Sequence, residues 1–401
     1  MIVYTIRHFV FTLNRISGEQ RIYYQDIVDS DLPRVSVIVP MHNEEKVASY
    51  ILAQLTKADY PRDRFEIIPI DDHSEDQTGA IIDKYASRFP VIKPLYRNSG
   101  IRGKTHALNE ALQVARGKVI VVFDADYLPP AGIVRDIAVS FKDPEVGAVM
   151  GRVIPRNTKS KLLTRLLDLE RSGGYQVDQQ ARHNMKLMPQ YGGTVGGFRR
   201  DVVLSLGGFN PKILTEDTEL TFKLVIAGWK VIYANRAECF EEVTETWSAR
   251  ARQISRWARG HSQVMLWFIK PFLKSKNLTL GEKIDGILLM GIFFIPLIIL
   301  VALPVTLALF FLGEMNILNT VIIFLLVAAY NAFGNFAPFF QIGTAAFIDG
   351  TKSRVNLLPF FFFSFLYNII YVSKGSLTSI VDVVFNRDPV WQKTTRFRQK
   401  G

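Results

Sequence analysis

Two aspartates in the segment GKVIVVFDAD could share a metal ion. Asp124 and Asp126 follow five apolar residues, Val119–Phe123, which predict a buried strand. Alternate residues of an extended segment face the same way, so both carboxylates could point at one cation. Hard oxygen ligands with open positions suit Mg²⁺ or Mn²⁺ on a diphosphate. The alternative is a pair of solvated loop acids, and the buried strand followed by the breakers Pro129 and Pro130 favours the metal site.

Two further polar groups lie where strands and helices should meet. Asp71 and Asp72 end the segment FEIIPIDD, and their carboxylates can accept hydrogen bonds from nucleobase N–H groups or ribose hydroxyls. Helix capping is the structural alternative for this cluster and suits Ser74 or Asp76. Lys104 ends NSGIRGK at an expected helix start, where N–H groups and an ammonium suit phosphate. The spacing does not match a P-loop, so the sequence does not indicate an ATPase.

The segment QISRWARG joins an amide, a guanidinium and an indole on one helix face. Gln253, Arg256 and Trp257 stand at i, i+3 and i+4. One interpretation is a basic helix on a membrane with tryptophan as its anchor. The other is a site wall, with a flat indole for a sugar ring and polar groups for hydroxyl or phosphate oxygens. We expect both to hold for different residues, with this face directed at the site. The residues expected to contact lipid are Arg250, Arg252 and Lys270.

The elements that must position these residues alternate between strand and helix. The pattern predicts strands at 35–40, 65–72, 91–96 and 117–126, and helices from near Asn43 and at 77–88 and 104–115. This alternation is typical of an α/β fold with a doubly wound, mostly parallel sheet. Ligands of such sheets bind beyond the carboxyl ends of the strands, where the acidic clusters stand.

Long uncharged runs predict a membrane part after this domain. The runs Gly286–Gly313 and Met315–Ile348 carry no charged residue, and Val355–Val372 is a shorter third run. A membrane helix needs about 20 apolar residues, which the first two runs exceed. The single cysteine, Cys239, excludes a disulfide framework and fits a reducing compartment.

The positive charge of the chain is concentrated beside these runs. Seven Lys and Arg residues and no acid lie in 246–281, and five bases and one acid lie in 385–401, which accounts for the net charge of +11. Such clusters are typical of a cytoplasmic membrane surface. A nucleic-acid surface is the competing explanation, but it would require bases spread over the soluble domain.

Five parts of the chain are expected. Residues 1–33 form an N-terminal interfacial segment without a signal-peptide cleavage site, and 34–245 form the doubly wound domain. Residues 246–281 form the basic interfacial region, 282–373 the membrane region and 374–401 a basic cytoplasmic tail. Loop charges favour two crossings, 286–313 and 316–340. The segment 355–373 then re-enters the membrane or lies at its interface, although a third crossing stays open.

The motifs together resemble membrane-bound family 2 glycosyltransferases of the GT-A fold, which include cellulose, chitin, hyaluronan and poly-N-acetylglucosamine synthases. The resemblance covers residues 35–260. It rests on VPMHNEE (39–45), DDHSED (71–76), FDADYLPP (123–130), GGFRR to GGF to TED (196–217) and QISRW (253–257). The departures are His73 in place of a common glycine, Val243 and Thr244 where a proline is common, and no N-terminal membrane helices.

This resemblance implies roles for the residues of the motifs. Asp217 would be the general base, Asp124 and Asp126 would hold Mg or Mn, and Gln253, Arg256 and Trp257 would frame the acceptor and the diphosphate. The segment VWQKTTR resembles a gating segment that closes over the nucleotide, with a plain basic tail as the equal alternative. Donor contacts would come from Pro40, Asn43, Glu44, Asp71, Asp72, Lys104, Glu216, Trp391 and Arg396.

The expected function is transfer of a sugar from a UDP-sugar to an acceptor hydroxyl with inversion, giving a β-linkage in polysaccharide synthesis. A glycolipid synthase acting on ceramide, diacylglycerol or a polyprenyl acceptor is the alternative, and a catalytically silent membrane scaffold is a third. The enzyme would be a multi-pass protein of the plasma membrane with a cytoplasmic catalytic domain. Lipid, and a homo-oligomer or an export partner, would be its partners, and nucleic acid would not.

Overall fold

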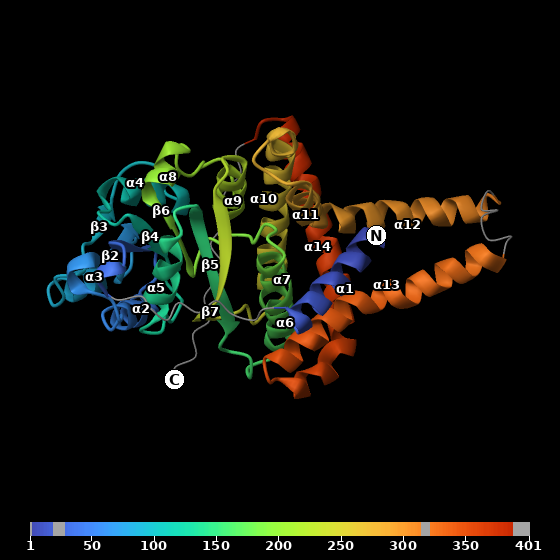
Figure 1. Ribbon diagram of the computed structural model, residues 1–401, viewed down its shortest axis with the longest axis horizontal. Helices are drawn as coiled ribbons and strands as arrows, with labels where there is room; N and C mark the ends of the chain where they lie inside the picture. Colours follow the sequence, from blue (N-terminus) through green and yellow to red (C-terminus); the bar gives the residue numbers. More distant parts are fainter. Residues whose placement is uncertain (1, 19–28, 314–320, 388–401) are drawn as a thin grey trace.

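The computed structural model describes residues 2–18, 29–313 and 321–387. These residues form an α/β domain and a helical part that projects from it (Figure 1). The expected gating residues, Trp391 and Arg396, lie outside the described residues.

A seven-stranded sheet runs through the α/β domain in the order β3-β2-β1-β4-β6-β5-β7. Strand β6 is antiparallel to both of its neighbours, and every other pair is parallel, which confirms the mostly parallel doubly wound sheet. The strands are β1 (Val35–Met41), β2 (Phe65–Asp72), β3 (Leu95–Arg97), β4 (Val119–Val122), β5 (Val146–Pro155), β6 (Gly196–Arg199) and β7 (Lys230–Glu241).

Helices bury both faces of this sheet, which explains the continuous apolar runs of its strands. Val37 and Val39 pack into the core on one face with α2, α3 and α5, whereas Ile38 packs into the other core with α4, α8 and α9. The helices are α2 (Ala48–Leu55), α3 (Thr78–Ala86), α4 (Lys104–Val114), α5 (Ile133–Ala138), α6 (Leu162–Ser172), α7 (Gln180–Asn184), α8 (Arg200–Ser205), α9 (Glu216–Ile226) and α10 (Trp247–Lys274).

Two expected boundaries were wrong. Strand β4 ends at Val122, and the chain turns with a hydrogen bond from the Tyr127 N–H to the Asp124 carbonyl. Asp124 and Asp126 therefore lie in a turn, and strand alternation does not align their carboxylates. Helix α2 begins at Ala48 and not near Asn43, whose positive φ of 52° is incompatible with a right-handed helix.

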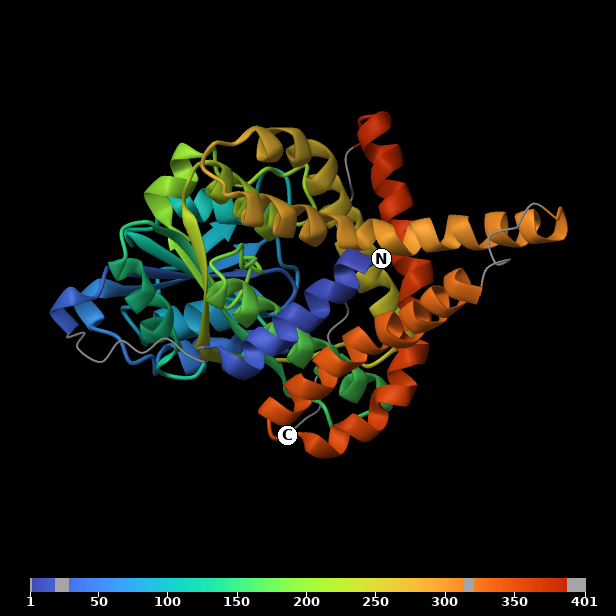
Figure 2. The ribbon, with the colours of Figure 1, turned by 45° about the vertical axis from the view of Figure 1, so that its right-hand side comes forward.

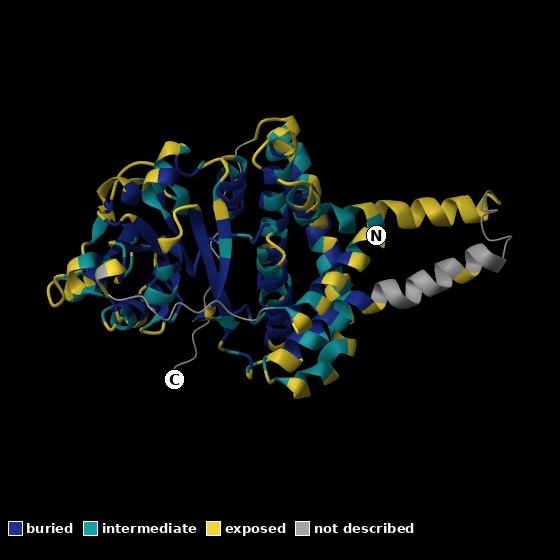
Figure 3. Ribbon diagram, in the orientation of Figure 1, coloured by how far each residue is buried: buried dark blue, intermediate teal, exposed yellow. Residues whose placement is uncertain are grey.

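The first helix of the projecting part, residues 295–311, is apolar on its outside. Helix α12 (Ile295–Phe311) buries no residue, and α13 (Val321–Ile348) lies beside it (Figures 1 and 2). The exposed colouring covers α12 from Leu300 to its end at Phe311 (Figure 3). Among the described residues, Leu280–Phe311 and Lys352–Val384 are helical stretches long and apolar enough to cross a membrane, and Phe336–Ile348 is shorter. The first stretch includes α11 (Leu280–Gly291) and the turn η5 (Ile292–Phe294).

Helix α14 (Leu358–Val384) packs along α10 and crosses the direction of α12 and α13 (Figures 1 and 2). Its contact face is small and polar: a Cβ on Gly375 would come within 2.3 Å of the Ser255 carbonyl oxygen. Asp382 binds the Nε of Arg259 at 2.5 Å. The number of crossings, and whether 355–373 is one of them, stay predictions.

Candidate active site

One cavity of about 520 Å³ connects the carboxyl edge of the sheet with α10, α11 and η5. Asn43 and Asp71 are not among its lining residues, whereas the other predicted site residues of the described chain are. Those that line it are Pro40, Glu44, Asp72, Lys104, Asp124, Asp126, Glu216, Asp217, Gln253, Arg256 and Trp257.

Lys104 lies between the expected metal site and α9. Its Nζ is 2.9 Å from Oδ1 of Asp124 and 3.0 Å from Oε1 of Glu216. Burial alone would lower the pKa of Lys104, but these two carboxylates raise it above its ordinary value. The Lys104 ammonium therefore neutralises part of the negative charge of Asp124 and Glu216.

The residues present fit a hard divalent cation held together with a ligand. Asp124 and Asp126 both line the cavity, but in the described chain no three His, Cys, Asp or Glu residues converge on one metal position. Mg²⁺ commonly uses one or two carboxylates and takes its other ligands from a phosphate and water. The described lining contains ten carboxylates against five Lys and Arg residues, so a diphosphate would need a cation to offset its repulsion.

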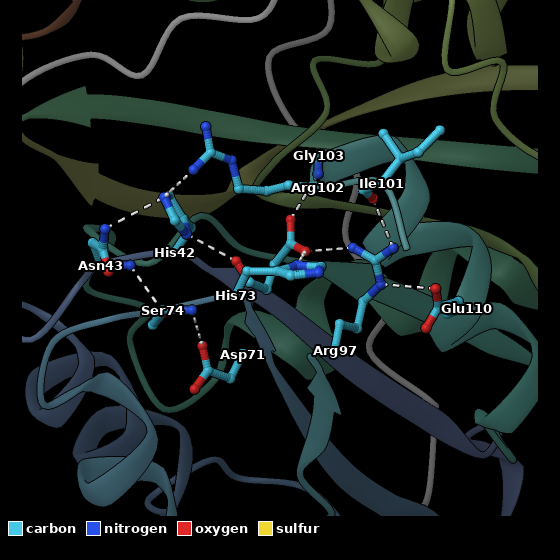
Figure 4. Close-up of polar contacts among 11 residues, drawn as sticks. His42, Asn43, Asp71, His73, Ser74, Arg97, Ile101, Arg102, Gly103 and Glu110 are labelled. Carbon is cyan, nitrogen blue, oxygen red and sulfur yellow. Dashed lines mark hydrogen bonds and ion pairs between the residues drawn. The ribbon is translucent and has the colours of Figure 1, made fainter. Parts of the chain in front are cut away.

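Asp72 organises the loop before α4, where Figure 4 shows Arg97, Ile101 and Gly103. Its Oδ1 accepts from Arg97 and lies 2.8 Å from Nδ1 of His73, and its Oδ2 accepts from the Gly103 N–H at 2.8 Å. Arg97 also donates to the carbonyl of Ile101 at 3.0 Å. The carboxylate thus fixes the start of α4, while its expected contact with a nucleobase stays a prediction.

Asp71 and Asn43 tie two loops together outside the cavity lining. Oδ1 of Asp71 accepts from the Ser74 N–H at 3.1 Å, and the Asn43 N–H donates to the Ser74 hydroxyl at 2.9 Å. Oδ1 of Asn43 accepts from the Glu75 N–H at 2.8 Å. These contacts give both side chains a structural role at the edge of the site.

Asp217 lies in the first turn of α9, next to Glu216, and lines the cavity. Burial first, and the neighbouring Glu216 carboxylate second, raise the pKa of Asp217 to about 7. Its Oδ1 accepts from the Thr218 N–H at 2.7 Å and from the Thr218 hydroxyl at 3.3 Å. A carboxyl group with a pKa near neutrality is suited to accept a proton during a reaction.

His261 and Gln190 complete the hydrogen bonds of the Thr218 hydroxyl. The Gln190 amide donates to Thr218 Oγ1 at 2.9 Å, and Nδ1 of His261 is also 2.9 Å away. Burial lowers the pKa of His261 to about 4, so the imidazole is neutral, and its ring stacks on Phe293 at 4.5 Å. With the proton on Nδ1, His261 also donates, and the Thr218 hydroxyl is directed at Asp217.

Two guanidinium groups lie near the ring of Trp257. The Cζ atoms of Arg171 and Arg250 lie 5.2 and 5.6 Å from its ring centroid. The expectation that Arg250 contacts lipid was wrong: its side chain is 2% exposed and forms an ion pair with Glu170 at 2.7 Å. Its NH1 also donates to Oε1 of Gln253 at 3.2 Å, so Arg250 braces the predicted face of α10 from within.

Sequence reasoning missed one wall of the cavity. The π-helical segment η4 (Gly173–Gln179) and the end of α6 contribute Arg171, Gly174, Tyr175 and Asp178, which stand at i, i+3, i+4 and i+7. That spacing is the signal that could have identified them. Nε of Arg171 is 2.7 Å from Oε1 of Glu241, a carboxylate that no motif marked.

The sequence matches known proteins over the same region. The family described as "Glycosyltransferase like family 2" matches residues 33–260. The chain is 36% identical over 251 residues to "Probable glycosyltransferase YdaM" of Bacillus subtilis (strain 168), covering 62% of this chain and 60% of that protein. It is 34% identical over 232 residues to "Beta-monoglucosyldiacylglycerol synthase" of Synechocystis sp., covering 58% and 48%. The matches thus span about half to three fifths of these relatives.

The fold has a counterpart among solved structures. A mannosyltransferase of Pyrobaculum calidifontis, in complex with GDP-Man and Mn²⁺, superposes with a TM-score of 0.60 and 22% identity, covering 95% of this chain and 98% of the other. This likeness concerns the fold. Because the family match extends over more than half of the chain and includes the motifs that line the cavity, the protein belongs to glycosyltransferase family 2.

Proposed function

We propose that the protein transfers a hexose from a UDP-sugar to a hydroxyl group of a lipid at the membrane surface, with inversion to a β-linkage. The observation that carries the proposal is the continuity of the cavity. Its lining includes Asp124 and Asp126 after β4, and also Leu289, Ile292 and Phe293, which directly precede α12. We call the part of the lining formed by η4, α10, α11 and η5, together with Arg171 and Arg182, the acceptor half. A polar donor and an apolar acceptor presented by the bilayer could meet there.

The residues of the chain supply the steps of a single displacement. Asp124 and Asp126 would hold Mg²⁺ or Mn²⁺, which supplies charge neutralisation to the leaving diphosphate. Lys104 would contribute a second positive charge on the donor side. Asp217 would take the proton of the acceptor hydroxyl as the oxygen attacks the anomeric carbon. One displacement inverts that carbon, so an α-linked donor gives a β-linked product.

The charges of the acceptor half favour an alcohol over a phosphate as the attacking group. Arg171 and Arg182 line this half, and each pairs with a carboxylate, Glu241 and Asp285 respectively. An alcohol also needs a base such as Asp217, whereas an ionised phosphate does not. The name of the Synechocystis relative, a glucosyldiacylglycerol synthase, supports a lipid alcohol.

The polysaccharide product expected from the motifs is the competing candidate, because the QISRW segment stands where polymer synthases carry theirs. Membranes containing the protein, incubated with radiolabelled UDP-glucose or UDP-N-acetylglucosamine, should give an organic-soluble glycolipid. A labelled polymer that stays at the origin of a chromatogram would contradict the lipid acceptor and support the polymer.

Gly174 offers a variant that narrows the acceptor half alone. It lines the cavity, and an added Cβ would meet no atom within 4 Å. Gly174→Leu should therefore place its side chain in the cavity and lower glycolipid formation about tenfold or more, a loss of roughly 1.4 kcal/mol of transition-state binding. Gly174→Ala is the matched control and should keep most activity. Equal activities of both variants would contradict the placement of the acceptor.

We also propose that α12 and α13 cross the plasma membrane with the α/β domain on the cytoplasmic side. The apolar surface of α12 and the position of α14 along α10 support two crossings. In sealed right-side-out vesicles, protease added outside should leave residues 34–245 intact, and it should digest them in inverted vesicles. Digestion in both or the reverse pattern would contradict this orientation.

A further inference from the structure

Helix α1 (Ile2–Ser17) carries a stripe of apolar side chains on its outside, while Phe11 is buried. Both of its arginines are buried, with Arg7 at 7% and Arg15 at 4% exposure, whereas the outward stripe contains no charged residue. The helix lies beside α13, and the rings of Phe9 and Phe340 are 5.8 Å apart (Figure 2). The exposed apolar residues of α1 are Ile2, Val3, Ile6, Val10, Leu13 and Ile16.

The inner face of α1 is bound to the cavity wall. NH2 of Arg7 is 3.2 Å from Oδ2 of Asp178, and its Nε is 3.7 Å from Oδ1 of Asp285. Asp285 in turn binds Nε of Arg182 at 2.9 Å. Burial alone would raise the pKa of Asp178, but Arg7 first, and Arg182 next, hold it below its ordinary value. Asp178 and Arg182 both line the cavity.

Arg15 holds the same wall two turns further along α1. Its Nε donates to the carbonyl of Gln176 at 2.6 Å, and its NH2 donates to Oε1 of the same side chain at 2.9 Å. Gln176 and Asp178 both belong to η4. A π-helix is rare and occurs mostly as a single turn, so contacts from outside the segment matter for its position.

We propose that α1 is a lipid-seated brace: its apolar stripe rests in the bilayer surface, and its buried arginines hold η4 at the acceptor half of the cavity. Helix α1 packs against α13, and the Tyr4 hydroxyl donates to the carbonyl of Leu288 shortly before α12. The stripe therefore lies next to the helices proposed to cross the membrane, which identifies the occupant as lipid. Because the arginines are already engaged with Asp178, Asp285 and Gln176, the contact depends on apolar burial and not on anionic headgroups.

Contact with lipid then couples to the site. A bilayer stabilises only the docked arrangement, in which the stripe faces outward and the arginines face η4. Membrane contact therefore increases the order of the wall that contains Gly174, Tyr175 and Asp178. The consequence for acceptor binding rests on the proposed function, whereas the contact and the ordering of η4 do not.

A fluorescent label on α1 tests whether the apolar stripe contacts lipid. The single cysteine, Cys239, is fully buried, and burial raises the pKa of its thiol, so an introduced cysteine can be labelled selectively. Ile6→Cys carrying an environment-sensitive dye should be quenched by nitroxide lipids in pure phosphatidylcholine vesicles, at least about threefold more than Tyr50→Cys, which is exposed on α2. Equal quenching, or quenching that requires anionic lipid, would overturn the proposal.

Hydrogen exchange of the full-length protein in lipid nanodiscs tests the brace. Arg7→Gln should accelerate exchange of the amides in 173–182 about tenfold and leave β1 and α2 unchanged, and Arg7→Lys should restore part of the protection. Arg62→Gln, which removes an exposed arginine far from η4, is the control. Unchanged exchange in 173–182 would overturn the brace, as would equal acceleration throughout the domain. Since neither measurement uses turnover, failure of the proposed reaction would be seen separately, in the product assay.

Discussion

Asp217→Asn should reduce glycosyl transfer about a thousandfold, within the range of 10² to 10⁴ that a general base contributes. The asparagine has nearly the same shape and can keep the hydrogen bond from the Thr218 N–H, but it cannot take a proton from an acceptor hydroxyl. Initial rates at saturating donor, with Asp201→Asn as a control, measure the effect; Asp201 is exposed in the first turn of α8. Unchanged activity would remove Asp217 from the reaction and revive the silent-scaffold hypothesis.

The raised pKa of Asp217 adds two observations that distinguish lost chemistry from lost folding. The base must be ionised, so kcat/KM of the wild type should fall about tenfold per pH unit below its pKa of about 7.

The folded-state pKa of Asp217 lies above the unfolded value of about 3.9, so ionisation of Asp217 opposes folding as pH rises through this window. At pH 8 Asp217→Asn should therefore raise the melting temperature by about 2 °C or more, and below pH 4 this gain should vanish. A lower melting temperature at pH 8 would contradict the burial argument.

The sheet and its acidic edge could be predicted because both follow from local patterns. Strands buried on two faces are continuous apolar runs, and the residues after them must lie at the carboxyl edge. This placed Asp72, Asp124 and Lys104 in one cavity. The turn after β4 could not be predicted from the sequence, because an apolar run does not show where its hydrogen bonding to neighbouring strands ends.

The inner supports of the site could not be predicted, because each depends on a partner far along the chain. Arg250 looks like a lipid-facing base until Glu170, 80 residues earlier, is placed beside it. Asp72 likewise meets Arg97 only through the pairing of β2 with β3. The residues of the η4 wall are spaced as on one face of a helix, but only the tertiary structure shows that this face lines a cavity.

Trp257→Ala should lower kcat/KM for transfer about a hundredfold while leaving the protein in the membrane. The indole lines the cavity, and the guanidinium groups of Arg171 and Arg250 both lie near its ring. Removing it takes away a flat surface for a sugar ring and also frees both arginines to move, one of them paired with Glu241. Misplacing groups around a reacting centre by about 1 Å is enough for a loss of this size.

Trp267 on the same helix provides the matched control for the anchor interpretation. It is 37% exposed and lies ten residues beyond Trp257 in α10. Trp267→Ala should keep transfer within about twofold, because surface substitutions away from a site have small effects. Flotation of proteoliposomes measures attachment for both variants. If Trp257→Ala released the protein while the detergent-solubilised enzyme stayed active, the tryptophan would be an anchor, and the site face of α10 would have to be reassigned.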